Sequence, residues 1–117
     1  MARLSTHVLD TSRGQAAAGM KVALWRFDGA DRVHCLTQVT NGDGRTDKPL
    51  LSGDRIPTGH FEITFAAGDY FRALGVSLTD PPFLEEIVVR FGIADPTGNY
   101  HVPLLVSPYG YSTYRGT

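Results

Sequence analysis

Three polar side chains that lie far apart in the chain are of types that can transfer protons or bind oxygen atoms. His7 lies in the stretch LSTHVLD, Arg45 directly follows the turn NGDG, and His101 opens the stretch HVPLLVSPYGYSTYRGT that runs to Thr117. An unperturbed imidazole has a pKa of about 6.5, so it can accept or donate a proton near neutral pH. The planar guanidinium of arginine holds carbonyl or anionic oxygens through paired hydrogen bonds. These side chains are the candidates for proton transfer and oxygen binding.

The last four residues differ from the polar, frayed ends of most chains. Tyr114, Arg115, Gly116 and Thr117 combine an aromatic ring, a cation, a glycine and a hydroxyl. One interpretation is an ordinary final hairpin that turns at residues 107–110, where proline and glycine suit a tight turn. The other is that this segment is tucked into a site and supplies polar groups there.

No metal or organic cofactor is predicted. The four histidines and the single cysteine, Cys35, show no close metal-ligand spacing,. A nucleophile elbow, a phosphate loop and a dinucleotide fingerprint are also missing from the sequence. Cys35 alternates with Val33 and Thr37 in a strand pattern, which predicts a buried, inert thiol. His34 and His60 are expected on the surface or rim of strands.

The composition indicates one globular domain spanning residues 1–117. Hydrophobic residues make up 42% of the chain, which is enough for a packed core,. The net charge of −1 indicates no nucleic-acid partner and no membrane surface,. A single cysteine fits a reducing compartment, and the first residues lack the apolar run of a signal peptide. The expected location is cytoplasmic.

The elements that must position these residues are short strands. Alternation of apolar residues predicts strands at residues 4–9, 20–27, 32–40, 60–66, 85–91, 101–106 and 111–114, and a short one near 54–56,. Helical spacing predicts one short helix within residues 68–75. Many short strands with regular turns favour an all-β, two-sheet antiparallel sandwich. In their strands His7 and His101 both lie opposite the main apolar row, which puts both on an outer sheet face.

Taken together, the motifs around His7 and Arg45 and the segment from His101 to Thr117 resemble the 5-hydroxyisourate hydrolases, the enzyme branch of the transthyretin-like family. The resemblance covers essentially the whole chain and includes the stretches LWRF, GDYF and PPFLEEIVVRFGI. Its most specific part is the ending Tyr-Arg-Gly followed by a hydroxyl residue. The family usually ends in serine, and here Thr117 keeps the hydroxyl and adds a methyl group.

This resemblance implies a transthyretin-like sandwich of two four-stranded sheets and a homotetramer, a dimer of dimers, with sites in a channel between dimers. It implies no cofactor and a small-molecule substrate. The implied functional residues are His7, Arg45, His101, Tyr114, Arg115, Gly116 and Thr117. The implied reaction opens the six-membered ring of 5-hydroxyisourate at a cyclic amide and yields 2-oxo-4-hydroxy-4-carboxy-5-ureidoimidazoline.

The chemistry expected from these residues is direct attack by water. A histidine would take the proton, and Arg45 would stabilise the developing oxyanion. His7 is the preferred base and His101 the preferred positioner or proton donor, although the sequence allows either assignment. Thr117 would orient water or substrate through its hydroxyl.

Two other function classes fit the same fold. A transthyretin-like carrier would bind a small ligand between dimers without chemistry, and a structural sandwich would need no site. Fold alone does not separate these classes, because function depends on the site residues. A carrier has no need for two histidines, an arginine and a hydroxyl that converge in one channel.

Overall fold

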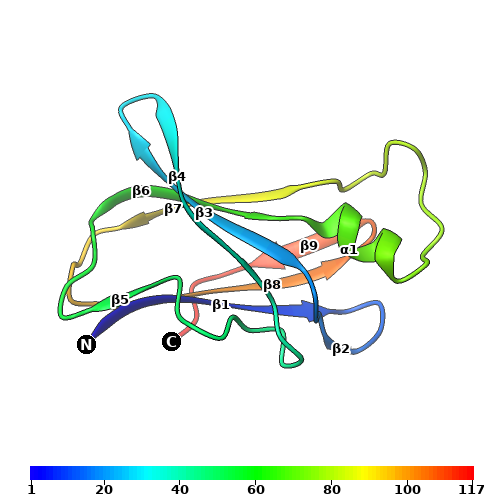
Figure 1. Ribbon diagram of the computed structural model, residues 1–117, viewed down its shortest axis with the longest axis horizontal. Coiled ribbons are helices and arrows are strands. Elements are labelled where there is room, and N and C mark those ends of the chain that lie inside the picture. The colour runs from blue at the N-terminus through cyan, green and yellow to red at the C-terminus, as the bar shows by residue number, and fades with distance from the viewer.

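The computed structural model describes residues 1–117 as two β-sheets packed face to face, with one short helix at one end (Figure 1). The elements in chain order are β1 (Ala2–Asp10), β2 (Gln15–Ala16), β3 (Lys21–Asp28), β4 (Asp31–Val39), β5 (Leu51–Gly53), β6 (Gly59–Phe65), α1 (Ala67–Ala73), β7 (Ile87–Ile93), β8 (Asn99–Ser107) and β9 (Gly110–Thr113). The predicted sandwich with one short helix is confirmed. The single helix has 7 residues and is too short to span a membrane.

The first sheet has the strand order β2-β1-β8-β9, and β5 also pairs with β1. The second sheet has the order β4-β3-β6-β7 and is antiparallel throughout. In the first sheet β1 and β8 run parallel, whereas the sequence pattern predicted antiparallel pairing only. Parallel strands need a long connection, and here most of the chain lies between the two.

The core lies between the sheets and explains the alternation seen in the sequence. Leu4 and Val8 of β1 and Leu104 and Val106 of β8 are fully buried among 21 core residues. Each large apolar side chain removed from water contributes about 1.5–3 kcal/mol to stability. Because successive strand residues point to opposite faces, the residues between them are forced outward. His101 is one of these outward residues.

Two predictions about strands are wrong. The short strand near 54–56 lies at β5, a few residues earlier, where it pairs with the start of β1. Cys35 is exposed rather than buried. The pairing of β3 with β4 shifts at this point, because Leu24 lies opposite Leu36 but the next residue lies opposite His34. Cys35 is therefore the extra residue of a β-bulge, which breaks the alternation.

The helix is tied to the first sheet by a buried carboxylate. Tyr70 of α1 donates a hydrogen bond of 2.8 Å from its hydroxyl to Asp10 at the end of β1, whose side chain is buried. Burial raises the pKa of Tyr70, and the Asp10 carboxylate raises it further.

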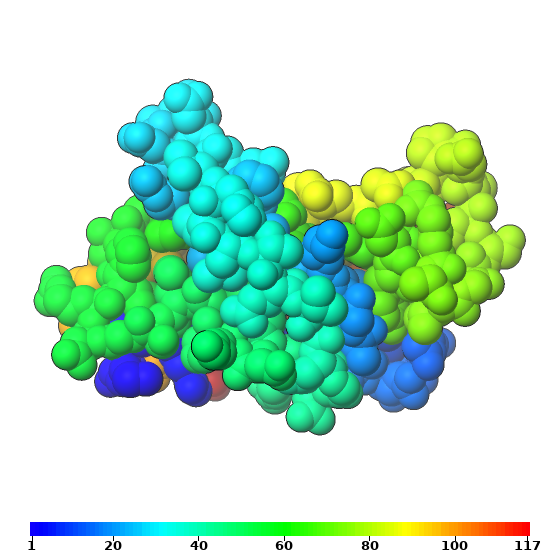
Figure 2. Space-filling model, viewed as in Figure 1, coloured from blue at the N-terminus to red at the C-terminus, as the bar shows by residue number.

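Figure 2 shows the β3–β4 hairpin and the segment after α1 projecting at opposite ends of the molecule. Figure 1 places the start of β1 and the C-terminal end of the chain near one edge, so both can contribute to one site.

Candidate active site

His101 is held in a defined orientation by two other segments. In the parallel register Ser5 of β1 lies beside His101 of β8, and the Ser5 hydroxyl is 2.8 Å from Nδ1 of the imidazole. Gly116 lies on the other side, where its backbone N–H donates to the His101 carbonyl at 2.8 Å. A Cβ atom at Gly116 would come within 2.6 Å of Cδ2 of the imidazole. Only glycine therefore leaves room for His101 in this position.

His7 is held by the loop that follows β4. Its Nε2 lies 2.8 Å from the backbone carbonyl oxygen of Asp43. A carbonyl oxygen can only accept a hydrogen bond, so in the neutral ring Nε2 carries the proton and Nδ1 carries the lone pair. This contact assigns the tautomer of His7 and leaves Nδ1 as its basic atom.

Residues 41–47 form a tight loop that brings Arg45 to His7. The Asn41 side-chain oxygen accepts hydrogen bonds from the backbone N–H groups of Asp43 and Arg45, which is the Asx-turn chemistry expected of this residue type,. The Val8 N–H then donates to the Gly44 carbonyl at 2.8 Å, and a β-bridge joins His7 to Arg45. Gly44 has φ of +75°, and a Cβ atom there would collide with the Val8 carbonyl,.

These segments enclose a polar pocket of about 290 Å³ on the outer face of the first sheet. The residues that line this polar pocket are Arg3, Ser5, Arg45, Asn99, Tyr100, His101 and Thr117. A neighbouring hollow shares Arg3, Ser5 and Arg45. Neither arginine takes part in any of the three salt bridges of the molecule, so both guanidinium groups are available for a ligand oxygen.

The electrostatics of the polar pocket favour a neutral His101. Burial lowers the pKa of the His101 imidazole below its ordinary value of 6.5, and the positive charge of Arg45, followed by His7 and Arg3, lowers it further,. The ring therefore stays uncharged at neutral pH. A neutral imidazole has one N–H donor and one lone pair, so it can bind a substrate oxygen without adding charge.

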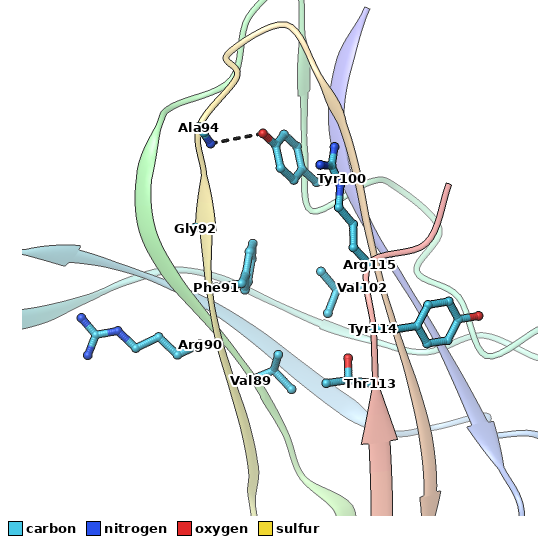
Figure 3. Close-up of a pocket in the computed structure, with 10 residues that line it drawn as sticks. All are labelled: Val89, Arg90, Phe91, Gly92, Ala94, Tyr100, Val102, Thr113, Tyr114 and Arg115. Carbon is cyan, nitrogen blue, oxygen red and sulfur yellow. Dashed lines mark hydrogen bonds between the residues drawn. The ribbon is translucent and has the colours of Figure 1, made fainter.

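Two of the residues that sequence reasoning assigned to the site have side chains that point elsewhere. Arg115 turns toward the opposite face of the sheet, where its guanidinium carbon lies 4.2 Å from the centre of the Tyr100 ring and Nη2 donates to the Asn99 carbonyl. Figure 3 shows Arg115 extending along Tyr100 and the Tyr114 ring pointing away from Phe91. Tyr114 is 61% exposed and makes no hydrogen bond. The structure brings Arg45, His101 and Thr117 together in the lining of the polar pocket. Gly116 and His7 do not line it: Gly116 lies against His101, and His7 is joined to Arg45 by the β-bridge.

The model of the HIUase/Transthyretin family matches residues 4–116 of the chain. The chain belongs to this family. Among curated HIUase/transthyretin proteins, it is similar to 5-hydroxyisourate hydrolase 2 of Rhizobium meliloti, with 57% identity over 98% of this chain and 96% of the relative. It is also similar to the 5-hydroxyisourate hydrolase of Mesorhizobium japonicum, with 55% identity over 98% of this chain and 92% of the relative.

Solved structures of similar proteins share the same sandwich. The Klebsiella pneumoniae 5-hydroxyisourate hydrolase superposes with a TM-score of 0.83, 32% identity and full coverage of both chains. (S)-allantoin synthase superposes with a TM-score of 0.92 and 43% identity over 99% of this chain, which spans 44% of that longer chain. Sea bream transthyretin, solved in complex with thyroxine, gives a TM-score of 0.85 at 25% identity, with 98% of this chain and 95% of that chain covered.

Sequence reasoning missed four residues of the polar pocket in this HIUase/transthyretin chain: Arg3, Ser5, Asn99 and Tyr100. A signal for two of them was present, because Arg3 and Ser5 precede His7 at two-residue intervals and so share its face of β1. Asn99 had the same kind of signal, because it precedes His101 by two residues and so shares its face of β8,. Asn99 reaches the pocket because it is the first residue of β8 and pairs with Arg3 of β1. No group of three or more His, Cys, Asp or Glu side chains is placed to hold a metal ion.

Proposed function

We propose that this protein hydrolyses 5-hydroxyisourate, a step of urate breakdown, and that the polar pocket is where the reaction takes place. The observation that supports this most is the placement of His101 beside Arg45 in a chain that matches full-length 5-hydroxyisourate hydrolases at up to 57% identity. The reaction opens a cyclic amide to a carboxylate. Such a step needs a proton acceptor for water and a donor for the carbonyl oxygen.

In the proposed mechanism a water molecule attacks the carbonyl carbon of the cyclic amide. Nδ1 of His7 accepts a proton from the water as the C–O bond forms. Arg45 donates hydrogen bonds to the carbonyl oxygen as it becomes an oxyanion. The C–N bond then breaks, and the proton held by His7 passes to the leaving nitrogen. A general base contributes typically 10²–10⁴-fold to such a rate, and one oxyanion donor about 10²–10³-fold.

The chain end would complete the pocket. Gly116 keeps His101 in place, and Thr117 lines the same pocket, where its hydroxyl could orient water or substrate. Arg115 would act by holding this segment against β8, because its guanidinium lies on Tyr100. Arg115 would thus contribute to substrate binding indirectly, through Gly116 and Thr117, whereas Tyr114 would contribute through its exposed ring.

We further propose a homotetramer that works in the cytoplasm. The edges of both sheets at β7 and β9 are unpaired and flank a mostly apolar groove, which is a surface suited to a second copy of the chain,. The free, exposed thiol of Cys35 is compatible with a reducing compartment,. Light scattering should give a mass near four times 12.7 kDa, and a monomeric mass would contradict the tetramer.

The carrier alternative has one supporting observation, the fold shared with sea bream transthyretin at 25% identity. The deciding experiment generates 5-hydroxyisourate in situ from urate and follows its ultraviolet absorbance with and without the purified protein. Hydrolysis predicts decay much faster than the spontaneous reaction. A decay at the spontaneous rate, together with tight binding of an aromatic ligand, would support the carrier instead.

A further inference from the structure

We propose that Ser5 is a positioning residue that selects the Nε2–H tautomer of His101, so that the two histidines enter the reaction in complementary roles. The inference deepens the proposed function and rests on it for the identity of the substrate. It assigns the base to His7 and the neutral hydrogen-bond donor to His101, a choice that the sequence left open.

The first step concerns the single hydrogen of the Ser5 hydroxyl. Its oxygen lies 2.8 Å from Nδ1 of His101, and this is the only hydrogen bond that the Ser5 side chain makes. The contact is half-buried and is set by the parallel register, which places Ser5 directly beside His101. The Ser5 side chain has no other hydrogen-bond partner within the protein, and we assign its hydroxyl as the donor to the lone pair on Nδ1. In the neutral ring the proton then lies on Nε2.

The second step concerns the free edge of the His101 ring. Nδ1 is occupied by Ser5, and Gly116 lies against Cδ2. Nε2 makes no hydrogen bond within the protein, and His101 lines the polar pocket. A ring held in this way presents an N–H group to a ligand and keeps its lone pair turned away. His101 would therefore donate to the developing oxyanion beside Arg45 and retain its proton throughout.

His7 has the opposite arrangement. The Asp43 carbonyl takes the proton of Nε2, so the lone pair lies on Nδ1. One histidine thus has its basic atom free and the other its N–H free. The Asp43 carbonyl sets the tautomer of His7, and the Ser5 hydroxyl sets the tautomer of His101.

The charges around His101 are consistent with this role. Arg3 and His7 face it from β1 and Arg45 from the loop, while Arg115 on its other neighbour turns away. Burial and these positive charges hold the pKa of His101 below 6.5, so the ring remains a neutral donor. Neutral imidazoles are known to act as such electrophilic donors in enzymes.

The test is a tautomer measurement on the purified wild-type protein. Nitrogen-15 NMR of the histidine side chains, at a pH above 7, distinguishes a protonated Nε2 from a protonated Nδ1. We expect His101 with the proton on Nε2. A proton on Nδ1 would overturn the proposal even if the protein hydrolyses 5-hydroxyisourate, and the tautomer can be measured even if it does not.

The matching variants are Ser5→Ala, which removes the hydroxyl, and Ser5→Thr, which keeps it. Ser5→Ala should lower kcat by about tenfold to a hundredfold with little change in KM, and should give a mixed His101 tautomer. Ser5→Thr should have a kcat and a His101 tautomer close to those of the wild-type protein. Ser107→Ala is the control, because the Ser107 hydroxyl bonds only to the Gly110 carbonyl at the β8–β9 turn.

A wild-type kcat and tautomer in Ser5→Ala would overturn the positioning role. So would a trapped acyl-enzyme on Ser5, detected by mass spectrometry, because Ser5 would then be a nucleophile activated by His101. Equal losses in Ser5→Ala and Ser107→Ala would show a general effect on the sheet and would also overturn it.

Discussion

The two main hollows of this molecule lie on opposite faces of the same strand, β8. His101 faces the polar pocket, whereas the next residue, Val102, faces a groove of about 370 Å³ between the open edges of the two sheets. The lining of this inter-sheet groove is Val89, Arg90, Phe91, Gly92, Ala94, Tyr100, Val102, Thr113, Tyr114 and Arg115 (Figure 3). The groove is larger and more apolar than the polar pocket, yet it contains no histidine.

In the proposed function, the larger and more apolar of the two hollows is not the site of the reaction. Such properties indicate where a small apolar ligand could bind. Hydrolysis of an amide requires water, a base and donors for an oxyanion, and those groups lie on the polar face. The predictions below test whether chemistry belongs only to that face.

The largest effect is expected from removing either histidine of the polar face. His7→Asn and His101→Asn should each lower kcat by roughly a hundredfold or more, because each removes a group that acts on a proton or an oxyanion. Steady-state kinetics and the mass of the assembled protein should be measured together. Near-normal turnover in both variants would refute the assignment.

Arg45→Lys should lower kcat/KM by about a hundredfold. A single ammonium cannot reproduce the planar pair of donors that stabilises an oxyanion. The kinetic measurement should be accompanied by circular dichroism, which we expect to be unchanged because Arg45 is exposed and makes no salt bridge. Wild-type kinetics would mean that Arg45 is only a solvated loop residue.

Gly116→Ala should lower kcat by about tenfold or more, because the added Cβ would displace the His101 ring from its position,. Gly110→Ala is the matched control, since a Cβ there meets only the Ser107 hydroxyl oxygen at 3.8 Å. The difference between the two variants measures how strongly the chain end controls His101. If both behave alike, the close approach of Gly116 to His101 has no functional role.

Arg45→Gln should raise the pKa of His101, since it removes a positive charge that opposes protonation of the imidazole,. An NMR titration of the histidine signals would measure this change in the His101 pKa.

The lowered pKa of His101 also predicts how the free energy of unfolding depends on pH. The folded pKa lies below 6.5, so the unfolded chain binds protons more readily, and stability should fall as pH drops from about 6.5 through the folded value. Removing Arg45 should weaken that fall, and an unchanged His101 titration would contradict the prediction.

The smallest effect is expected in the inter-sheet groove. Arg90 lines it, and its guanidinium lies 4.0 Å from the centre of the Phe27 ring. Arg90→Lys keeps the charge and should change kcat/KM by less than about twofold, as most surface substitutions cost under 0.5 kcal/mol. A loss comparable to that of Arg45→Lys would mean that the groove takes part in the reaction.

Much of the molecule could be predicted from the sequence because the deciding interactions are local. The two-residue period of β1 and β8 separates the buried Leu4 and Leu104 from the outward His7 and His101 without reference to any partner strand. The turn before Arg45 follows from glycine and asparagine chemistry. The position of Cys35 could not be predicted in this way, because the bulge depends on how β4 pairs with β3.

What the sequence by itself determined, then, is which side chains point away from the core and which segments turn. The tertiary structure alone decided their partners. Ser5 and His101 are 96 residues apart and meet because β1 and β8 pair in parallel, and His7 meets the Asp43 carbonyl across 36 residues because the loop docks on β1. Tautomers and pKa values depend on such contacts. No local spacing encodes them, since each arises from hydrogen bonds and charges that distant segments bring together.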